Sequence, residues 1–190
     1  LLLCFAGCTR ADWLDEILTI REAINEGRAI IYTSIDESIV TPKNSNSFGA
    51  TILSNTYKDG QGVIILDAKP ICIVSFTFED CTNLASITIP EGVTSIDRSA
   101  FIGCSNLESI TIPFVGDKRA TSTTSFLNPL GYIFGTTKYS NGSATTQHYG
   151  YSTYDHSKTY YIPCSLKSVT VTDSDIPNYA FEQCCNITDI

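Results

Sequence analysis

The sequence lacks methionine, has one tryptophan and two histidines, and carries few charged residues, at 17% of the chain. Lys and Arg number 12 against 20 Asp and Glu, which gives a net charge of −8. There is no basic stripe to neutralise phosphates, so nucleic acid is excluded as a partner. No apolar run reaches the ~20 residues that a membrane span requires. No Cys-x-x-Cys or Cys/His cluster with zinc spacing occurs, and we expect no metal or cofactor.

What the sequence does contain indicates a globular chain rather than a disordered one. Its 190 residues are 43% hydrophobic, enough for one domain with a sizeable core. Ser, Thr, Asn and Tyr are abundant, a composition that favours a β-rich fold meeting solvent through hydroxyl groups.

The strongest signal is an internal repeat. Residues 78–90 and 101–113 are offset by 23 positions and share nine of thirteen residues, including the ending Ser-Ile-Thr-Ile-Pro. A third copy starts at Phe181, and the strand signature recurs at residues 166–171. Because a fixed period in the twenties is typical of stacked coils, the sequence predicts a mostly β solenoid with 23-residue coils.

The repeat also predicts which side chains point inward. Alternate residues of a strand face opposite sides, so Ile87 and Ile89 face the core while Ser86 and Thr88 face outward. One coil cannot bury its apolar residues alone, whereas stacked coils form continuous ladders of Leu, Ile and Phe. A parallel strand ladder with short helical or 3-10 turns is therefore expected, and Pro90 ends its strand.

The motif Ala-Phe-x-x-Cys-x-Asn-Leu-x-Ser-Ile-Thr-Ile-Pro resembles the BspA-like subfamily of leucine-rich repeats. The resemblance covers roughly residues 30–190. It implies a leucine-rich-repeat solenoid in a secreted or surface-displayed bacterial protein used in adhesion or recognition. The family shares no catalytic residues, so the resemblance implies a protein that is not an enzyme.

Four segments are expected along the chain. Residues 1–8 read as a truncated signal, and residues 9–27 as a linker with an amphipathic helix between Asp12 as N-cap and Gly27 as stop. Residues 28–70 are expected to form an N-terminal β cap. Residues 71–190 are expected to form the solenoid, with an insertion at about 114–160 and a C-terminus truncated within a strand.

The first segment bears on localisation. Phe5-Ala6-Gly7-Cys8 resembles the lipobox of bacterial lipoproteins, in which the cysteine after the cleavage site carries the lipid. Cys8 is therefore a candidate for lipidation, with an ordinary cleaved signal or a packed N-terminus as the alternatives. Either signal places the chain outside the cell or on its surface, and lipidation would make it an outer-membrane lipoprotein whose sole membrane contact is this N-terminal anchor.

The remaining cysteines and the histidines offer little chemistry. Cys81, Cys104 and Cys184 share one repeat position and are interpreted as buried thiols in a ladder, with disulfides as the alternative in an exported chain. His148 and His156 lack a recognisable nucleophile and orienting acid, so a hydrolase is the weakest hypothesis.

Two surfaces are candidates for binding a host or neighbouring-cell protein, a matrix component or a glycan. The insertion carries seven tyrosines, a residue type enriched where proteins bind partners, although packing against the coils is an alternative role. A row of outward hydroxyls follows the strands. The candidate residues are Tyr139, Tyr149, Tyr151, Tyr154, Ser86, Thr88, Ser109, Thr111, Ser168 and Thr170. A structural spacer that displays another domain is the competing hypothesis.

Overall fold

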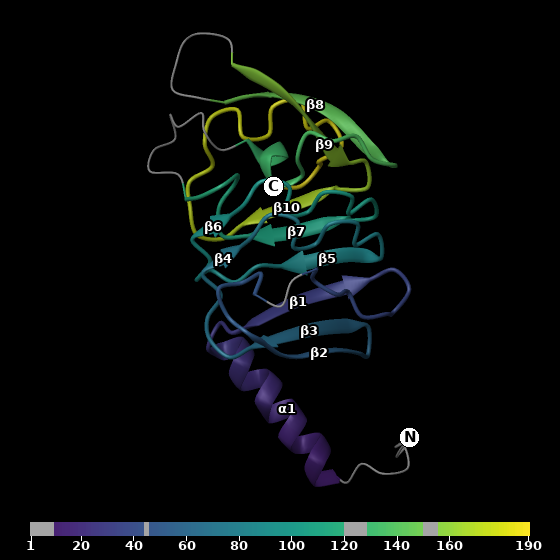
Figure 1. The fold of residues 1–190 in the computed structure, drawn as a ribbon, viewed down its shortest axis with the longest axis vertical. Coiled ribbons are helices and arrows are strands. Elements are labelled where there is room, and N and C mark those ends of the chain that lie inside the picture. Colours follow the sequence, from purple (N-terminus) through teal and green to yellow (C-terminus); the bar gives the residue numbers. More distant parts are fainter. Residues whose placement is uncertain (1–9, 44–45, 120–128, 150–155) are drawn as a thin grey trace.

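The computed structural model describes residues 10–43, 46–119, 129–149 and 156–190 (Figure 1). The described chain is mostly strand, with one α-helix and one short 3-10 helix. The strands lie one above another in a stack, with the helix projecting from one end and a hairpin lying across the other. The leucine-rich-repeat architecture expected from the sequence is thus present in its coarse features.

The largest sheet has six strands and is mixed rather than purely parallel. Three repeat strands are parallel and in register, whereas β1 runs antiparallel to its neighbours on both sides. The parallel ladder therefore ends at β5, and three antiparallel strands in the order β1-β3-β2 continue the sheet. In spatial order the strands are β10 (Ser168–Val171), β7 (Ser109–Ile112), β5 (Leu84–Thr88), β1 (Ala29–Ser34), β3 (Gln61–Leu66) and β2 (Ile52–Lys58).

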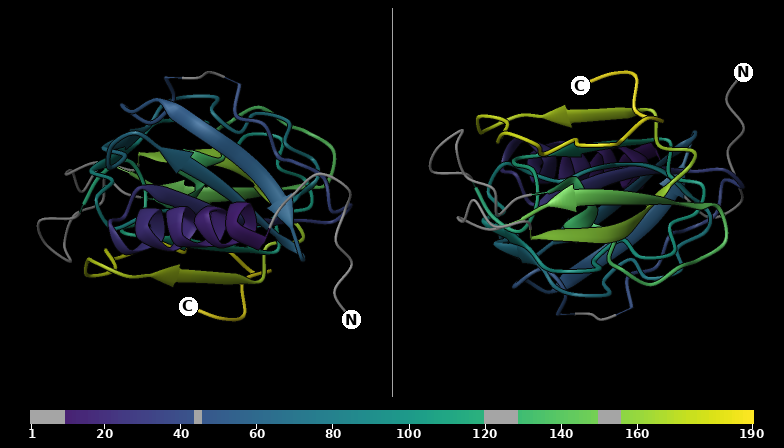
Figure 2. Two further views of the ribbon diagram at one scale, coloured as in Figure 1. Left: turned by 90° about the horizontal axis from the view of Figure 1, so that it is seen from below. Right: turned by 90° about the horizontal axis from the view of Figure 1, so that it is seen from above.

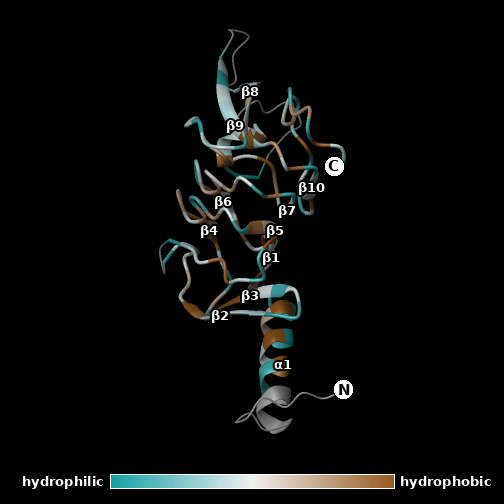
Figure 3. Ribbon diagram, turned by 90° about the vertical axis from the view of Figure 1, so that its right-hand side faces the viewer, coloured by the Kyte–Doolittle hydropathy of each residue, from teal (hydrophilic) through white to brown (hydrophobic). Residues whose placement is uncertain are grey.

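A second, short ladder lies on the opposite side of the coils. It consists of β4 (Cys72–Ile73) and β6 (Ser95–Ile96), which pair in parallel with Ile73 opposite Ile96. Figure 3 shows β4 and β6 on one side of the stack and β1, β5, β7 and β10 on the other. In the last coil, Ile176 holds the repeat position that Ile73 and Ile96 hold in the first two coils. Ile176 is nevertheless 40% exposed, because no strand of this ladder forms there among the described residues.

A column of phenylalanines fills the space between the two ladders. Phe48, Phe78, Phe101 and Phe134 are fully buried, and successive ring centroids lie 6.1, 5.1 and 6.4 Å apart. Around them pack the inward Ile and Leu of each strand, including Leu84 and Ile87. Because each coil contributes one ring, neighbouring coils bury what neither can bury alone.

The expected insertion at residues 114–160 is not one separate loop. Phe114 and Val115 lie in the core, and the 3-10 helix η1 (Leu130–Ile133) leads into the buried Phe134. Phe101 N donates to Ile133 O just as Phe78 N donates to Ala100 O, so η1 takes the place of a coil turn. The added material that the structure describes is mainly the antiparallel hairpin of β8 (Gly142–His148) and β9 (Ser157–Pro163), which Figure 2 shows from above.

Among its described side chains, the helix α1 (Arg10–Asn25) contacts the sheet through its last turns. Ala23 and Ile20 pack against Val63 and Ile65, whereas Leu18 is 52% exposed. The helix begins two residues before Asp12, so the prediction of Asp12 as N-cap is wrong. The stop at Gly27 is confirmed.

The end of α1 has the geometry of a Schellman motif. Gly27 adopts φ +68°, its N–H donates to Ile24 O, and Arg28 N donates to Ala23 O. The left-handed conformation costs glycine little because it has no Cβ, which explains why the helix stops there.

A tight turn and a close backbone approach fix the three antiparallel strands β1, β3 and β2. Asp59 and Gly60 both have positive φ, as a type I′ turn between β2 and β3 requires. On the neighbouring strand β1, the buried ring of Tyr32 lies directly over Gly62 of β3. A Cβ added at Gly62 would come within 2.1 Å of Tyr32 Cζ. The Tyr32 hydroxyl donates to Asn55 Oδ1 and accepts from Val40 N, so the ring is held in place from its far end.

This approach makes Gly62 intolerant of any side chain. We expect Gly62→Ala to lower the free energy of unfolding by about 2–3 kcal/mol, since the ring must leave its rotamer or the strands must separate. Gly92→Ala is the control, because the atom nearest to the added Cβ, Pro70 O, is 3.6 Å away. Urea denaturation of both variants measures the difference, and equal stabilities would contradict the packing described for Tyr32.

Candidate binding surfaces

The outward hydroxyls of the repeat strands form two straight rows. Across β5, β7 and β10 the residue partners are Ser86, Ser109 and Ser168 in one row and Thr88, Thr111 and Thr170 in the other. Between the rows, Ile87, Ile110 and Val169 point to the core and are at most 2% exposed. All six hydroxyl residues retain solvent contact, with Thr88 and Thr170 the most open. The predicted hydroxyl ladder is thus present, in the predicted register.

The Ser row continues onto β1. Thr33 lies opposite Ser86, and their hydroxyl oxygens are 2.6 Å apart. One strand further, the same face of the sheet turns apolar at Val63 and Ile65, where α1 covers it. The helix therefore marks one end of the polar strand face, as Figure 3 shows.

The predicted tyrosines of the insertion have different environments. Tyr149 is 39% exposed, with its ring 5.9 Å from that of His156 at the described end of the hairpin. Tyr139 is half-buried, and its hydroxyl donates to Tyr161 O at 2.9 Å. Burial raises the pKa of Tyr139 well above its ordinary value, so the hydroxyl stays protonated. Tyr151, Tyr154 and Cys8 lie outside the described residues.

Packing is the role of Tyr160. It is 3% exposed, and burial raises its pKa to about 12. Its ring lies against Gly131 of η1, where an added Cβ would come within 2.5 Å of it. Tyr160 therefore joins the hairpin to the coils rather than offering a contact surface.

A buried glutamine joins the hairpin to two other elements. Gln147 is completely buried; its Oε1 accepts from Gly131 N at 2.7 Å, and its Nε2 donates to Ala180 O at 2.9 Å. Nε2 also lies 3.5 Å from Cys184 Sγ. The Gln147 side chain thus bonds to the backbone of two other elements. It connects β8 to η1 and to the last coil.

The neighbouring His148 is hydrogen-bonded to the last coil. Its Nδ1 lies 2.6 Å from Glu182 Oε2, which also accepts from the His148 backbone N at 3.0 Å. Desolvation by burial opposes ionisation of Glu182, but the hydrogen bonds from His148 outweigh it, and the pKa of Glu182 is lowered. His156 contacts Tyr149.

The buried-thiol interpretation is confirmed for two of the three repeat cysteines, whereas Cys184 is half-buried. Cys81 and Cys104 are buried, and Cys104 Sγ lies 3.1 Å from Phe78 O. Burial raises the pKa of Cys81 to about 11, which keeps it a thiol and a poor nucleophile or metal ligand. All cysteines in the described ranges are free, and those ranges contain no group of three or more potential metal ligands.

Sequence reasoning missed several surface residues of the coil turns. Phe76 and Tyr179 lie two positions before the column residue of their coils, have φ of +63°, and are 47% and 56% exposed. Ser99 holds the same position in the second coil with φ +62° but is buried. Aligning the repeats at this position would have revealed the aromatic residues, although their backbone conformation leaves no mark in the sequence.

Gln147 provides a test of how the hairpin is attached. Gln147→Leu keeps the volume but leaves the Gly131 N–H without a partner, while Ala180 O keeps only its hydrogen bond from Leu130 N. We therefore expect a loss of about 1–3 kcal/mol of unfolding free energy. Thr146→Val, on the other face of β8, removes a half-exposed hydroxyl and should cost under about 0.5 kcal/mol. Thermal and urea unfolding measure both, and a neutral Gln147→Leu would refute the buried connection.

Glu182 predicts a pH dependence. Because its folded pKa lies below the unfolded value of 4.5, its stabilisation is present above pH 4.5 and is lost as pH falls through the folded pKa. With His148 partly exposed, we expect about 0.5–1 kcal/mol. The melting temperature of wild type should exceed that of Glu182→Gln near neutral pH and converge with it in acid. Glu16→Gln, on the exposed face of α1, is the control, and an unchanged gap in acid would contradict the assignment.

Comparison with known proteins identifies the repeat. The family model of the BspA-type leucine-rich repeat region matches residues 57–128 and 145–190 with six copies. Comparisons with the curated proteins and with solved structures gave no match. No helix in the described ranges has the length and apolarity needed to cross a membrane.

The match agrees with the geometry of the stacked strands. It covers more than half of the sequence, including β5, β7 and β10 and the polar strand face they carry. Repeats of this type are interaction or surface-repeat modules, typically non-enzymatic and associated with bacterial surfaces. The chain belongs to the BspA-type leucine-rich repeat family.

Proposed function

We propose that the chain is a non-enzymatic recognition module, displayed outside a bacterial cell, that binds a protein or glycan through the polar strand face. The observation that carries this proposal is the alignment of two hydroxyl rows across β5, β7 and β10. Their residues are Ser86, Ser109, Ser168, Thr88, Thr111 and Thr170, all uncharged and all in contact with solvent.

The hydroxyl rows are held rigidly by the core beneath them. Each hydroxyl stands on a strand whose neighbouring side chains are locked in the core, so little conformational entropy is lost when a partner binds. A hydroxyl both donates and accepts, and a regular array therefore suits a partner with repeating polar groups. The net charge of −8 lies outside the rows, which favours neutral over anionic partners.

The solenoid supplies this surface by repetition. In this proposal the 23-residue coil is the unit that adds one Ser and one Thr to the face. Residues 28–70 close the open end of the stack, and α1 covers the apolar part of the sheet beyond β1. Capping of this kind is what a solenoid needs to remain soluble.

The tyrosine-rich hairpin is proposed as a second contact. Tyr149 is exposed at its described end, and Tyr151 and Tyr154 follow it in the sequence. Tyrosine binds partners through a rigid amphipathic ring. Tyr139 is half-buried and its hydroxyl already donates to Tyr161 O, so it would contact a partner only through the edge of its ring. Lipidation of Cys8 is proposed as the means by which the module is held at the cell surface.

Replacing one row tests the strand face. Thr88→Ala, Thr111→Ala and Thr170→Ala combined should weaken binding at least tenfold, because three hydrogen-bonding groups are lost, while the melting temperature changes little. The control is a triple alanine variant at Thr19, Thr94 and Thr137, three exposed threonines outside the six-stranded sheet.

A mammalian glycan array and a set of purified matrix proteins serve as probes, and each hit is measured by biolayer interferometry. Tyr149→Ala reports separately on the hairpin. Wild-type affinity of the row variant for every hit would refute the strand face, and the absence of any hit would count against recognition as the function.

A further inference from the structure

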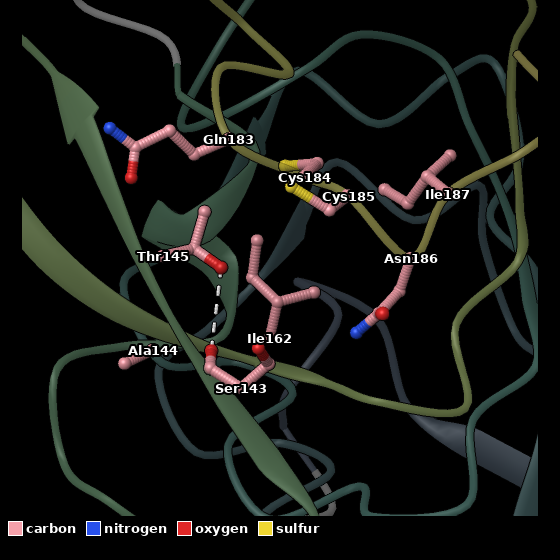
Figure 4. Close-up of a pocket in the computed structure, with 9 residues that line it drawn as sticks. All are labelled: Ser143, Ala144, Thr145, Ile162, Gln183, Cys184, Cys185, Asn186 and Ile187. Atoms are coloured by element: carbon pink, nitrogen blue, oxygen red, sulfur yellow. Dashed lines mark hydrogen bonds between the residues drawn. The ribbon is translucent and has the colours of Figure 1, made fainter.

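A pocket of about 350 Å³ lies between the β8–β9 hairpin and the last coil (Figure 4). Its volume is within the range of about 300–1,000 Å³ typical of small-molecule sites. Ser143 and Thr145 line it from β8 and Ile162 from β9, while Gln183, Asn186 and Ile187 line it from the last coil. It is separate from the polar strand face.

The polar groups of this pocket are neutral and have hydrogen-bonding capacity to spare. Two hydroxyls and two carboxamides line it, and no charged side chain does. The Thr145 hydroxyl donates only to Ser143 O, at a long 3.4 Å. Within the described ranges, the side chains of Ser143, Gln183 and Asn186 have no hydrogen-bond partner. Four side chains that both donate and accept are thus available to a ligand.

The rest of the lining is apolar and fixed. Ile162 is 4% exposed and packs in the main core, and Ile187 packs against the same core from the other side. The buried Gln147 ties β8 to the last coil two residues from Thr145, so the two walls are held at a set separation before any ligand arrives. A preformed site loses little entropy on binding.

The backbone of Gln183 repeats a feature of the coil turn. Gln183 and Asp80 of the first coil both adopt φ +56°, and the corresponding residue of the second coil is Gly103 at φ +77°. Each of these coils thus turns at this position in the left-handed conformation, which costs glycine least. In the last coil this turn begins the segment 183–187 that lines the pocket.

We propose that this pocket binds one ring of a neutral saccharide. Ring hydroxyls match the donor and acceptor capacity of Ser143, Gln183 and Asn186, and the C–H face of the ring matches Ile162 and Ile187. The absence of charge in the lining disfavours sialic acids, uronic acids and phosphates. The polar groups come from two elements, β8 and the last coil, instead of following one strand edge, as an extended peptide would require.

The test uses the ¹⁵N-labelled 190-residue chain and four methyl glycosides, those of glucose, galactose, mannose and N-acetylglucosamine. At least one glycoside should shift the side-chain amide signals of Gln183 and Asn186 and the backbone signals of residues 183–187, with a Kd of about millimolar. Gln183→Gly removes the amide while relieving the backbone, so it should weaken binding about five- to tenfold without lowering the melting temperature. Asn186→Ala should weaken binding to a similar extent.

Thr137→Ala is the matched control, because it removes an exposed hydroxyl outside both the pocket and the strand face and should leave the Kd unchanged. The proposal is overturned if none of the glycosides shifts these signals at about 50 mM, or if Gln183→Gly binds as wild type. It is equally overturned if short neutral peptides shift the same signals and the glycosides do not. Because the strand-face test uses other residues, either site can fail while the other stands.

Discussion

Stacking of coils is the constraint on which the rest of the molecule depends. Each coil has inward residues such as Leu84 and Ile87 that it cannot bury alone, and each depends on the coil beside it. Strand pairing fixes the vertical spacing, and the buried column from Phe48 to Phe134 fixes the lateral register. Once inward residues are locked in this way, the outward Ser and Thr must line up. The regularity of the polar strand face is thus a consequence of how the core is buried.

The same constraint explains how departures from the repeat are accommodated. Where η1 replaces a regular turn, Phe134 still enters the column and the backbone bonds of Phe101 are kept. At the other end, β1 pairs antiparallel with β5 yet places Thr33 beside Ser86. The stack tolerates a change in strand direction or an added hairpin as long as the ladder hydrogen bonds and the buried column are continued.

Those features that follow from a local period could be predicted from the sequence, and those that depend on distant contacts could not. Ser86 and Ser109 were placed on one row because they are 23 residues apart and share a motif. Phe134 was missed as a column residue because no Cys-x-Asn-Leu follows it. Gln147 reads as an ordinary residue of a polar strand, since its partners Gly131 and Ala180 lie 16 and 33 residues away.

The two proposed recognition surfaces differ in how they are held, and this difference has consequences for how each would respond to pH. The strand face is fixed by apolar burial, which does not depend on the ionisation of a side chain. The hairpin and the adjoining pocket are held to the last coil by polar contacts of Gln147 and by the Glu182–His148 pair. Protonation of Glu182 weakens only the second attachment. Mild acid should therefore loosen the hairpin before it disturbs the hydroxyl rows, and pocket binding should fall with pH ahead of any loss of the strand face.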